Sequence, residues 1–126
     1  MRIMLVDDEA DLLDTMGTIL EINGYDVIKV TDGADVVPSA IMEQPNLILL
    51  DVMLPHRTGW SVCKELHDNA LTVDIPIVMV SARSQQEDVE KGLQAGAKDY
   101  LIKPFMIEEL LAVISRWAKG EDSMAK

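Results

Sequence analysis

The feature of this sequence that most constrains its fold is an apolar run of four residues, Leu47–Leu50, that ends directly in the carboxylate of Asp51. Pro45 precedes the run and Pro55 follows Asp51 closely, so the run is too short for a helix and is typical of a strand. A strand that is apolar on both faces belongs to a parallel sheet covered by helices, and such sheets bind ligands at the carboxyl ends of their strands. A single Asp in this place usually only opens the next turn, so other residues must decide whether Asp51 is functional.

Along the rest of the chain, short apolar runs alternate with segments of helical periodicity. The runs predict strands at residues 2–6, 25–30, 47–50, 75–80 and 100–102. The periodic segments predict helices at residues 10–23, 59–69, 85–95 and 107–118, and one more helix that opens at 32–33 and ends at about 44. Five strands that alternate with five helices predict an α/β fold, with a doubly wound, five-stranded parallel sheet, helices on both faces and right-handed crossovers.

Pro38 lies inside the second of these helical patterns. A proline beyond the first turn of a helix removes a backbone hydrogen bond and clashes with the preceding turn. We therefore expect this helix to start late, near Asp35, or to be kinked at Pro38, and to be the weakest of the five.

Length and composition indicate one domain and exclude several classes of protein. The 126 residues suit a single domain, which we predict to span residues 1–118, with residues 119–126 as a disordered tail or the start of a linker. The net charge of −11 argues against direct binding of nucleic acid by the domain itself. The apolar runs are too short for membrane insertion and the start of the chain does not suit a signal peptide, so we predict a cytoplasmic protein. Cys63, the single cysteine, is expected to be a buried structural thiol.

Five polar residues follow the predicted strands, and in a parallel sheet they meet at one edge. They are Asp7 and Asp8 after the first strand, Asp51 after the third, Ser81 at the end of the fourth and Lys103 after the fifth. Three carboxylates brought together repel one another unless a cation neutralises them, and their oxygen ligands suit Mg²⁺. An ammonium and a hydroxyl beside that cation are what a phosphoryl group requires. The pattern therefore predicts a magnesium and phosphoryl site.

Each of these residues also has a purely structural interpretation. Asp7 and Asp8 are suited to cap the first helix, Ser81 is suited to cap the fourth, and Lys103 is suited to be a solvated lysine at the end of a strand. Each structural interpretation is favoured for a residue taken alone. Their joint occurrence at the correct edge favours the functional one.

Four motifs together resemble the receiver domain of two-component response regulators. These motifs are Val6-Asp7-Asp8-Glu9, the segment 50–55 with Gly59, Ser81-Ala82-Arg83, and the segment 96–105 that ends in Lys103-Pro104-Phe105. The resemblance covers residues 1–118. It implies a flavodoxin-like fold with the strand order 2-1-3-4-5.

The resemblance also implies a role for each residue of the acidic cluster. Asp51 is expected to be the phosphoacceptor, which attacks the phosphohistidine of a sensor kinase. Asp8, Asp51 and the backbone carbonyl of Met53 are expected to bind Mg²⁺ directly, and Asp7 to bind it through a water molecule.

By the same resemblance, Lys103 pairs with a phosphoryl oxygen and the bond between Lys103 and Pro104 is cis. The hydroxyl of Ser81, which stands where many relatives have threonine, moves to bond another phosphoryl oxygen. Tyr100 then turns inward as the aromatic switch residue. His56, in the polar loop after Asp51, is suited in principle to relay a proton, but an exposed histidine without a role is the favoured interpretation.

The predicted function is thus a phosphorylation-dependent switch without an output domain of its own. Its expected partners are a sensor histidine kinase or phosphotransfer protein and a downstream protein. An Mg²⁺-dependent phosphohydrolase with Asp51 as its nucleophile is the alternative, but that class encloses its substrate with a cap or insertion that this sequence lacks. A third possibility is that the chain is a piece of a longer protein.

The last predicted helix suggests where the downstream protein docks. Its inward stripe is predicted to be Ile107, Leu110, Leu111 and Ile114. That stripe leaves Val113 and Trp117 on an adjacent face, where they are candidates for exposure, although packing on the fourth helix is nearly as well supported. The expected docking surface is built from the fourth helix, the fifth strand and the fifth helix.

Overall fold

The computed structural model describes residues 1–118, which form five strands and five helices. In chain order these elements are β1 (Arg2–Val6), α1 (Ala10–Ile22), β2 (Asp26–Val30), α2 (Gly33–Glu43), β3 (Leu47–Leu50), α3 (Gly59–Asp68), β4 (Ile77–Ser81), α4 (Gln86–Gln94), β5 (Asp99–Ile102) and α5 (Ile107–Trp117). All neighbouring strands pair in parallel, in the order β2-β1-β3-β4-β5. This confirms the predicted flavodoxin-like fold and strand order. The predicted tail, 119–126, lies outside the described residues.

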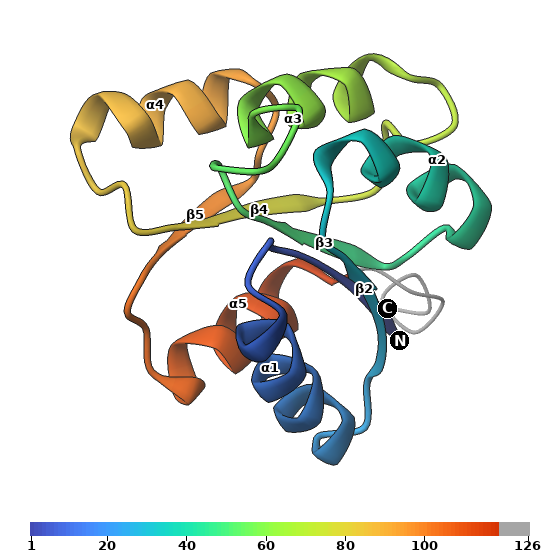
Figure 1. The fold of residues 1–126 in the computed structure, drawn as a ribbon, viewed down its shortest axis with the longest axis vertical. Coiled ribbons are helices and arrows are strands. Elements are labelled where there is room, and N and C mark those ends of the chain that lie inside the picture. Colours follow the sequence, from blue (N-terminus) through green and yellow to red (C-terminus); the bar gives the residue numbers. More distant parts are fainter. Residues whose placement is uncertain (119–126) are drawn as a thin grey trace.

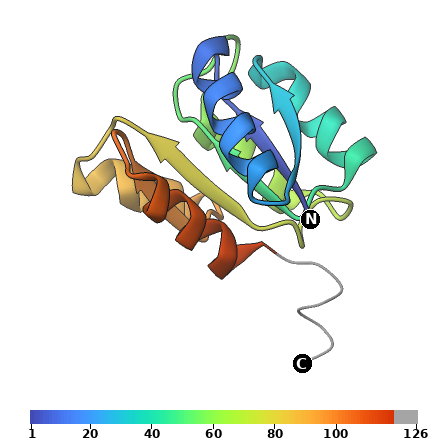
Figure 2. The ribbon, with the colours of Figure 1, turned by 90° about the horizontal axis from the view of Figure 1, so that it is seen from below.

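The sheet separates two layers of helices, with α1 and α5 on one face and α2, α3 and α4 on the other (Figures 1 and 2). Successive side chains of a strand point to opposite faces, so Met4 and Val6 of β1 belong to the core beneath α2 and α3, and Ile3 and Leu5 to the core beneath α1 and α5. All four residues of β3, the central strand, are buried. This is why its sequence is continuously apolar instead of alternating. No helix among residues 1–118 has the length and apolar character needed to cross a membrane.

Cys63 is buried in the core between the sheet and α3, as predicted. Burial raises the pKa of its thiol to about 12. At neutral pH this thiol is therefore protonated and shielded from reagents, so its role is structural.

α2 begins at Gly33, so the predicted late start near Asp35 is wrong. The carboxylate of Asp32 accepts a hydrogen bond from the backbone N–H of Ala34, which caps the helix, and the N–H of Gly33 donates to the carbonyl of Pro55. These two contacts satisfy early N–H groups of the helix, so the first turn forms although Pro38 lies inside the helix.

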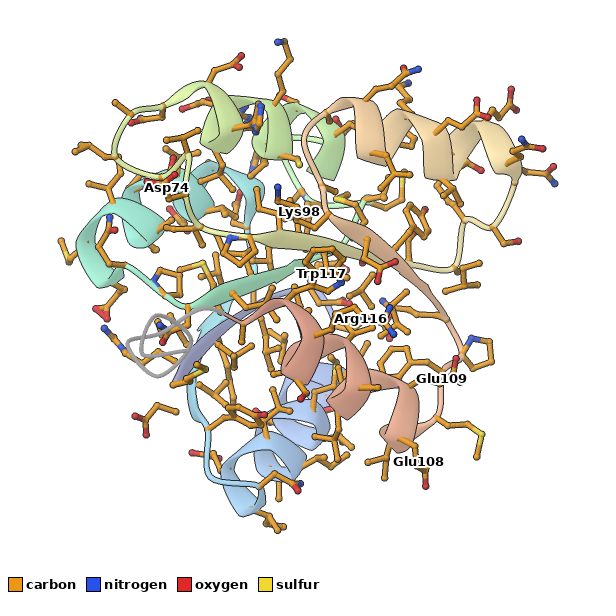
Figure 3. The ribbon with its side chains drawn as sticks, turned by 180° about the vertical axis from the view of Figure 1, so that it is seen from behind. Asp74, Lys98, Glu108, Glu109, Arg116 and Trp117 are labelled. Atoms are coloured by element: carbon orange, nitrogen blue, oxygen red, sulfur yellow. The ribbon has the colours of Figure 1, made fainter. Side chains whose placement is uncertain are left out.

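The buried face of α5 also differs from the prediction. Leu110 and Ile114 are fully buried as expected, but Ile107 is 49% exposed and Val113 only 9% exposed. Trp117, labelled on α5 in Figure 3, is half-buried against the same core. Its indole N–H donates to Asp99 on β5. The helix thus buries Leu110, Val113 and Ile114 and half-buries Leu111 and Trp117, which together follow the spacing of one helical face. The prediction that Val113 and Trp117 form an exposed apolar patch is wrong.

Gly59, the first residue of α3, allows this helix to start directly against the end of β3. Its N–H donates to the carbonyl of Val52 at 2.6 Å. A Cβ atom at this position would lie 2.2 Å from the backbone oxygen of Asp51. Only a glycine permits this approach, which keeps the loop after Asp51 folded tightly over the sheet edge.

Candidate functional site

The three predicted carboxylates converge at the carboxyl edge of the sheet. Asp7 and Asp8 follow β1, Asp51 follows the neighbouring strand β3, and one carboxylate oxygen from each lies within 4.8 Å of the others. Asp7 and Asp51 are buried, whereas Asp8 is exposed to solvent. The cluster therefore has two carboxylates at its base and one at its mouth.

Lys103 partly neutralises this cluster from the end of β5. Its Nζ donates to Asp7 Oδ2 at 2.6 Å and lies 3.5 Å from Asp51 Oδ2. Burial opposes the charged form of this lysine, but the hydrogen bond to Asp7 and the charges of Asp51 and Asp7 together raise its pKa. Lys103 is thus held as a cation where a phosphoryl group would need one.

The environment of Asp51 disfavours the ionised form of its carboxylate. Burial raises its pKa to about 6, and the negative charge of Asp7 adds to that rise, while Lys103 opposes it. A lysine is therefore not sufficient to make the ionised form of Asp51 as favourable as it is in water. A second cation in the cluster would do so.

The purely structural interpretations of these residues do not hold. The N-cap of α1 is Glu9, whose own backbone N–H donates to Asp7, and the N-cap of α4 is Gln85 and not Ser81. Lys103 is not a solvated lysine, because its side chain is mostly covered and paired. The caps that these residues were suited to provide are therefore not made.

Ser81 and Tyr100, the two predicted switch residues, are joined through one residue. Ser81 is buried at the end of β4, and its Oγ accepts a hydrogen bond from the backbone N–H of Arg83. The hydroxyl of the half-buried Tyr100 donates to the backbone carbonyl of the same Arg83 at 2.7 Å. Burial raises the pKa of this tyrosine hydroxyl, so it is a hydrogen-bond donor at neutral pH.

Two further predictions concern the segments beside the cluster. The bond between Lys103 and Pro104 is cis, as predicted. Met53 has an exposed side chain, its N–H donates to Asp51 Oδ1 at 3.4 Å, and it forms an antiparallel bridge with Thr58. Its carbonyl as a metal ligand remains a prediction.

The structure gives partners to two residues for which sequence reasoning assigned no role. His56 adopts a positive φ of 68°, and its Nδ1 lies 2.7 Å from Oδ2 of Asp32, the cap of α2. Arg83 contacts both switch residues, as described above. Its place two residues after Ser81 was the only signal available in the sequence, whereas no local signal links His56 to Asp32, 24 residues earlier.

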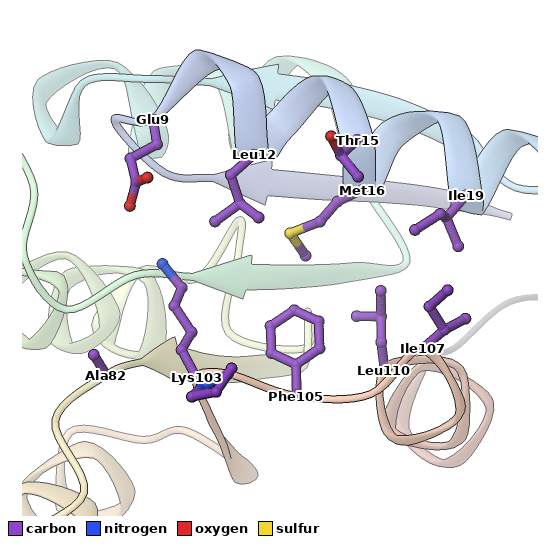
Figure 4. Close-up of a pocket in the computed structure, with 11 residues that line it drawn as sticks. Glu9, Leu12, Thr15, Met16, Ile19, Ala82, Lys103, Phe105, Ile107 and Leu110 are labelled. Atoms are coloured by element: carbon purple, nitrogen blue, oxygen red, sulfur yellow. The ribbon is translucent and has the colours of Figure 1, made fainter.

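An apolar groove adjoins the site on the α1 side (Figure 4). Its volume is about 540 Å³, and it runs between α1 and the segment that joins β5 to α5. Its apolar lining consists of Leu12, Met16, Ile19, Ala82, Pro104, Phe105, Ile107 and Leu110. Lys103 and Glu9 line its end, so the groove and the carboxylate cluster share Lys103.

Comparison with known proteins shows the family of the chain. The sequence profile described as the response regulator receiver domain matches residues 3–115. The chain belongs to this family. The receiver domain of sensor histidine kinase PA1611 from Pseudomonas aeruginosa, solved with a magnesium ion in its active-site cleft, is 36% identical, with a TM-score of 0.85 over 92% of this chain and 95% of that one. The activated receiver domain of Klebsiella pneumoniae RstA has a TM-score of 0.86 at 25% identity over 95% of this chain and 100% of that one.

The similar full-length proteins are transcriptional regulators. The DNA-binding dual master transcriptional regulator RpaA of Synechocystis is 43% identical over 96% of this chain and 50% of its own length. The phosphate regulon regulator PhoB of Escherichia coli is 42% identical over 98% of this chain and 54% of its own length. The chain thus spans about half the length of the curated relatives that it matches.

The donor set of the receiver domain fits a hard divalent cation. Asp7, Asp8 and Asp51 supply only oxygen atoms, these atoms are close enough to share one ion, and one carboxylate remains exposed to admit it. Burial raises the pKa of Asp51 although Lys103 opposes that rise, so the ionised carboxylate is less favourable here than in water. Mg²⁺ at this position would favour the ionised form.

We expect Mg²⁺ to raise the thermal stability of the protein, because an ion that binds only the folded state stabilises it by mass action. At about 100 times its Kd, such an ion contributes about 2.7 kcal/mol, which corresponds to a shift of several degrees in Tm. Thermal unfolding with and without MgCl₂, at constant ionic strength, measures this shift.

The variant Asp8→Asn should lose most of the Mg²⁺-dependent shift. Asp11→Asn is the matched control, since Asp11 is an exposed carboxylate in the first turn of α1 outside the cluster. An equal shift in both variants would show that the ion binds elsewhere.

Proposed function

We propose that this receiver domain is a phosphorylation-dependent switch that accepts a phosphoryl group on Asp51 from the phosphohistidine of a sensor histidine kinase or phosphotransfer protein. The observation that carries this proposal is the cluster of Asp7, Asp8 and Asp51 with the ammonium of Lys103 at its base. A buried carboxylate beside a fixed cation, at the open edge of a parallel sheet, is a nucleophile with part of its charge neutralisation already in place.

The transfer needs a nucleophile, in-line access and neutralisation of charge. A carboxylate oxygen of Asp51 forms the new bond to phosphorus, while the bond between phosphorus and the histidine nitrogen breaks and leaves its electron pair on the imidazole. Lys103, 3.5 Å from Asp51, is placed to pair with a phosphoryl oxygen. Mg²⁺ held by Asp8, Asp51 and the carbonyl of Met53, with Asp7 acting through water, would neutralise further phosphoryl charge. The hydroxyl of Ser81 is the proposed donor to another oxygen.

The variant Asp51→Asn should not be phosphorylated, because the amide keeps the shape of the side chain but is not a nucleophile. Incubation with acetyl phosphate and MgCl₂, followed by intact-mass measurement, should show one added phosphoryl group on the parent protein and none on Asp51→Asn. Asp74→Asn, which changes an exposed carboxylate outside the cluster, should be labelled like the parent.

The same assay tests the alternative function. Stoichiometric labelling supports a switch, whereas many turnovers of phosphate esters per protein molecule would support the Mg²⁺-dependent phosphohydrolase. Full labelling of Asp51→Asn would show that the phosphoacceptor has been misassigned.

The apolar groove between α1 and the β5–α5 segment is the proposed contact for the phosphodonor protein. It shares Lys103 with the site, so a helix seated in it would bring a histidine on the neighbouring turn toward Asp51. Leu12 and Met16 on α1 face Phe105 across the groove and would supply its apolar contacts (Figure 4).

Leu12→Ser should slow phosphotransfer from the cognate kinase, which phosphotransfer profiling identifies, by about tenfold. A tenfold change corresponds to a loss of about 1.4 kcal/mol of binding free energy. Labelling by acetyl phosphate should be unchanged, because a small donor does not need the groove. Ile22→Ser, at the exposed far end of α1, is the control and should leave both rates unchanged. An equal effect of Leu12→Ser on both donors would contradict the proposed contact.

The surface formed by α4, β5 and α5 is the proposed docking site for the downstream protein. Since Val113 is buried and Trp117 half-buried, its exposed apolar residues include Leu93 on α4, at 44% exposure, and Ile102 on β5, at 42%. Tyr100 lies between these elements, because its ring packs against Gly92 of α4. A movement of Tyr100 would therefore alter this surface.

We expect amide exchange in residues 84–95 and 99–117 to change when beryllofluoride mimics the phosphoryl group. Residues 33–43 of α2, which pack against α3, β1 and β2, serve as the internal reference. Identical exchange with and without the mimic would rule out this surface as the one that responds.

The domain itself is proposed not to bind nucleic acid. Its net charge of −11 opposes binding to a phosphate backbone. A relative such as RpaA, named as DNA-binding, is about twice as long as the matched region, so its DNA contacts need not involve that region. A cytoplasmic location also remains a prediction.

A further inference from the structure

The backbone of Arg83 connects the two proposed switch residues to each other. Its N–H donates to Ser81 Oγ at 3.1 Å, and its carbonyl accepts the hydroxyl of Tyr100 at 2.7 Å. A displacement of either hydroxyl therefore acts on the same peptide units. Arg83 lies in the short loop between β4 and α4.

The side chain of Arg83 extends from this loop to two helices. Its Nε donates to Asp88 Oδ1 at 3.1 Å, and Asp88, in the first turn of α4, is only 7% exposed. Its guanidinium carbon lies 5.4 Å from the centre of the Trp60 ring on α3, and the ammonium of Lys91 lies 4.1 Å from the same ring. One residue thus joins the switch hydroxyls to α4 and α3.

Trp60 is held in place by these cations and by packing. In the part of the chain that the structure describes, its buried indole N–H has no hydrogen-bond partner. The ring therefore has no directional bond to fix it, and its surroundings depend on where Arg83 and Lys91 lie. This makes the indole a sensitive reporter of the loop and of α4.

We infer that Arg83 is a positioning residue that couples the phosphoacceptor site to α4 and to Trp60 of α3. This inference rests on the proposed function and adds the route by which the site acts on the helices. A buried carboxylate that loses its cation partner is strongly disfavoured, so Asp88 keeps its pairing as the loop moves, and the first turn of α4 moves with Arg83. The Trp60 ring then meets a different arrangement of charges.

A purely structural role for the pair is the competing explanation. In that case Arg83 and Asp88 would only stabilise the start of α4, in the same way with and without a phosphoryl group. The two explanations differ in a spectroscopic response to phosphorylation, which a fixed structural contact would not produce.

The test uses Trp60 fluorescence in the full chain. Trp117→Phe removes the second of the two tryptophans, so the emission comes from Trp60 alone. In this background the variants are Arg83→Gln, which keeps the backbone contacts but removes the charge, Asp88→Asn, and the double variant. Arg57→Gln is the matched control, since Arg57 pairs with Glu65 on α3 and has no hydrogen bond to Ser81 or Tyr100 among the described residues.

We expect all variants to accept one phosphoryl group from acetyl phosphate. The parent and Arg57→Gln should show a change in Trp60 emission and in amide exchange of residues 86–94 on phosphorylation, and Arg83→Gln and Asp88→Asn should lose both changes. The double variant should lose no more than either single variant, because both act on one contact. Asp88→Asn breaks the pair from the α4 side and keeps the test decisive if Arg83→Gln does not fold.

The possible failures are distinguishable. If the parent is not labelled, the proposed function and this inference both fail. If the parent is labelled but Arg83→Gln and Asp88→Asn respond like Arg57→Gln, or if the parent itself shows no response at Trp60 and α4, the inference alone is overturned.

Discussion

The repulsion among three carboxylates at one edge of the sheet is the constraint on which the rest of this site depends. Asp7 and Asp51 are buried side by side, and burial makes their repulsion stronger than it would be in water. Lys103 opposes this repulsion, but burial still raises the pKa of Asp51. The ionised form of Asp51 is therefore less favourable than in water, and a divalent cation bound beside it would favour that form.

Much of this arrangement could be predicted from the sequence because it follows from topology. Once β1, β3, β4 and β5 are parallel, the residues after them must share an edge, and Asp7, Asp51, Ser81 and Lys103 do. What could not be predicted depends on exact helix rotation and on distant contacts. Ile107 and Val113 exchanged their expected environments because a small rotation of α5 decides which of two adjacent faces is covered. The early start of α2 depends on the local cap by Asp32 and on the carbonyl of Pro55, which Gly33 reaches only in the folded chain.

The proposed contact with the phosphodonor and the proposed response at α4 lie on opposite faces of the sheet. The groove beside Lys103 belongs to the face covered by α1 and α5, whereas Asp88 and Trp60 belong to α4 and α3 on the opposite face (Figures 1 and 4). The carboxyl edge of the sheet borders both faces, and Asp51 lies at that edge on the central strand. A phosphodonor seated in the groove would thus leave α4 uncovered.

This separation matters because the phosphodonor would then reach Asp51 without covering the surface at α4 to which the downstream protein is proposed to bind. Ser81 ends β4, the strand between Asp51 on β3 and Tyr100 on β5, so a change in bonding at the site would reach Arg83 through one strand end. In the proposed coupling, Arg83 would transmit the change toward α4, since both its backbone contacts lie at the sheet edge and its guanidinium lies among the helices. A buried partner such as Asp88 makes that transfer directional, because a solvated partner could be exchanged for water at little cost. The same carboxyl edge therefore holds both the proposed phosphoacceptor, Asp51, and the first contacts of the proposed coupling to α4.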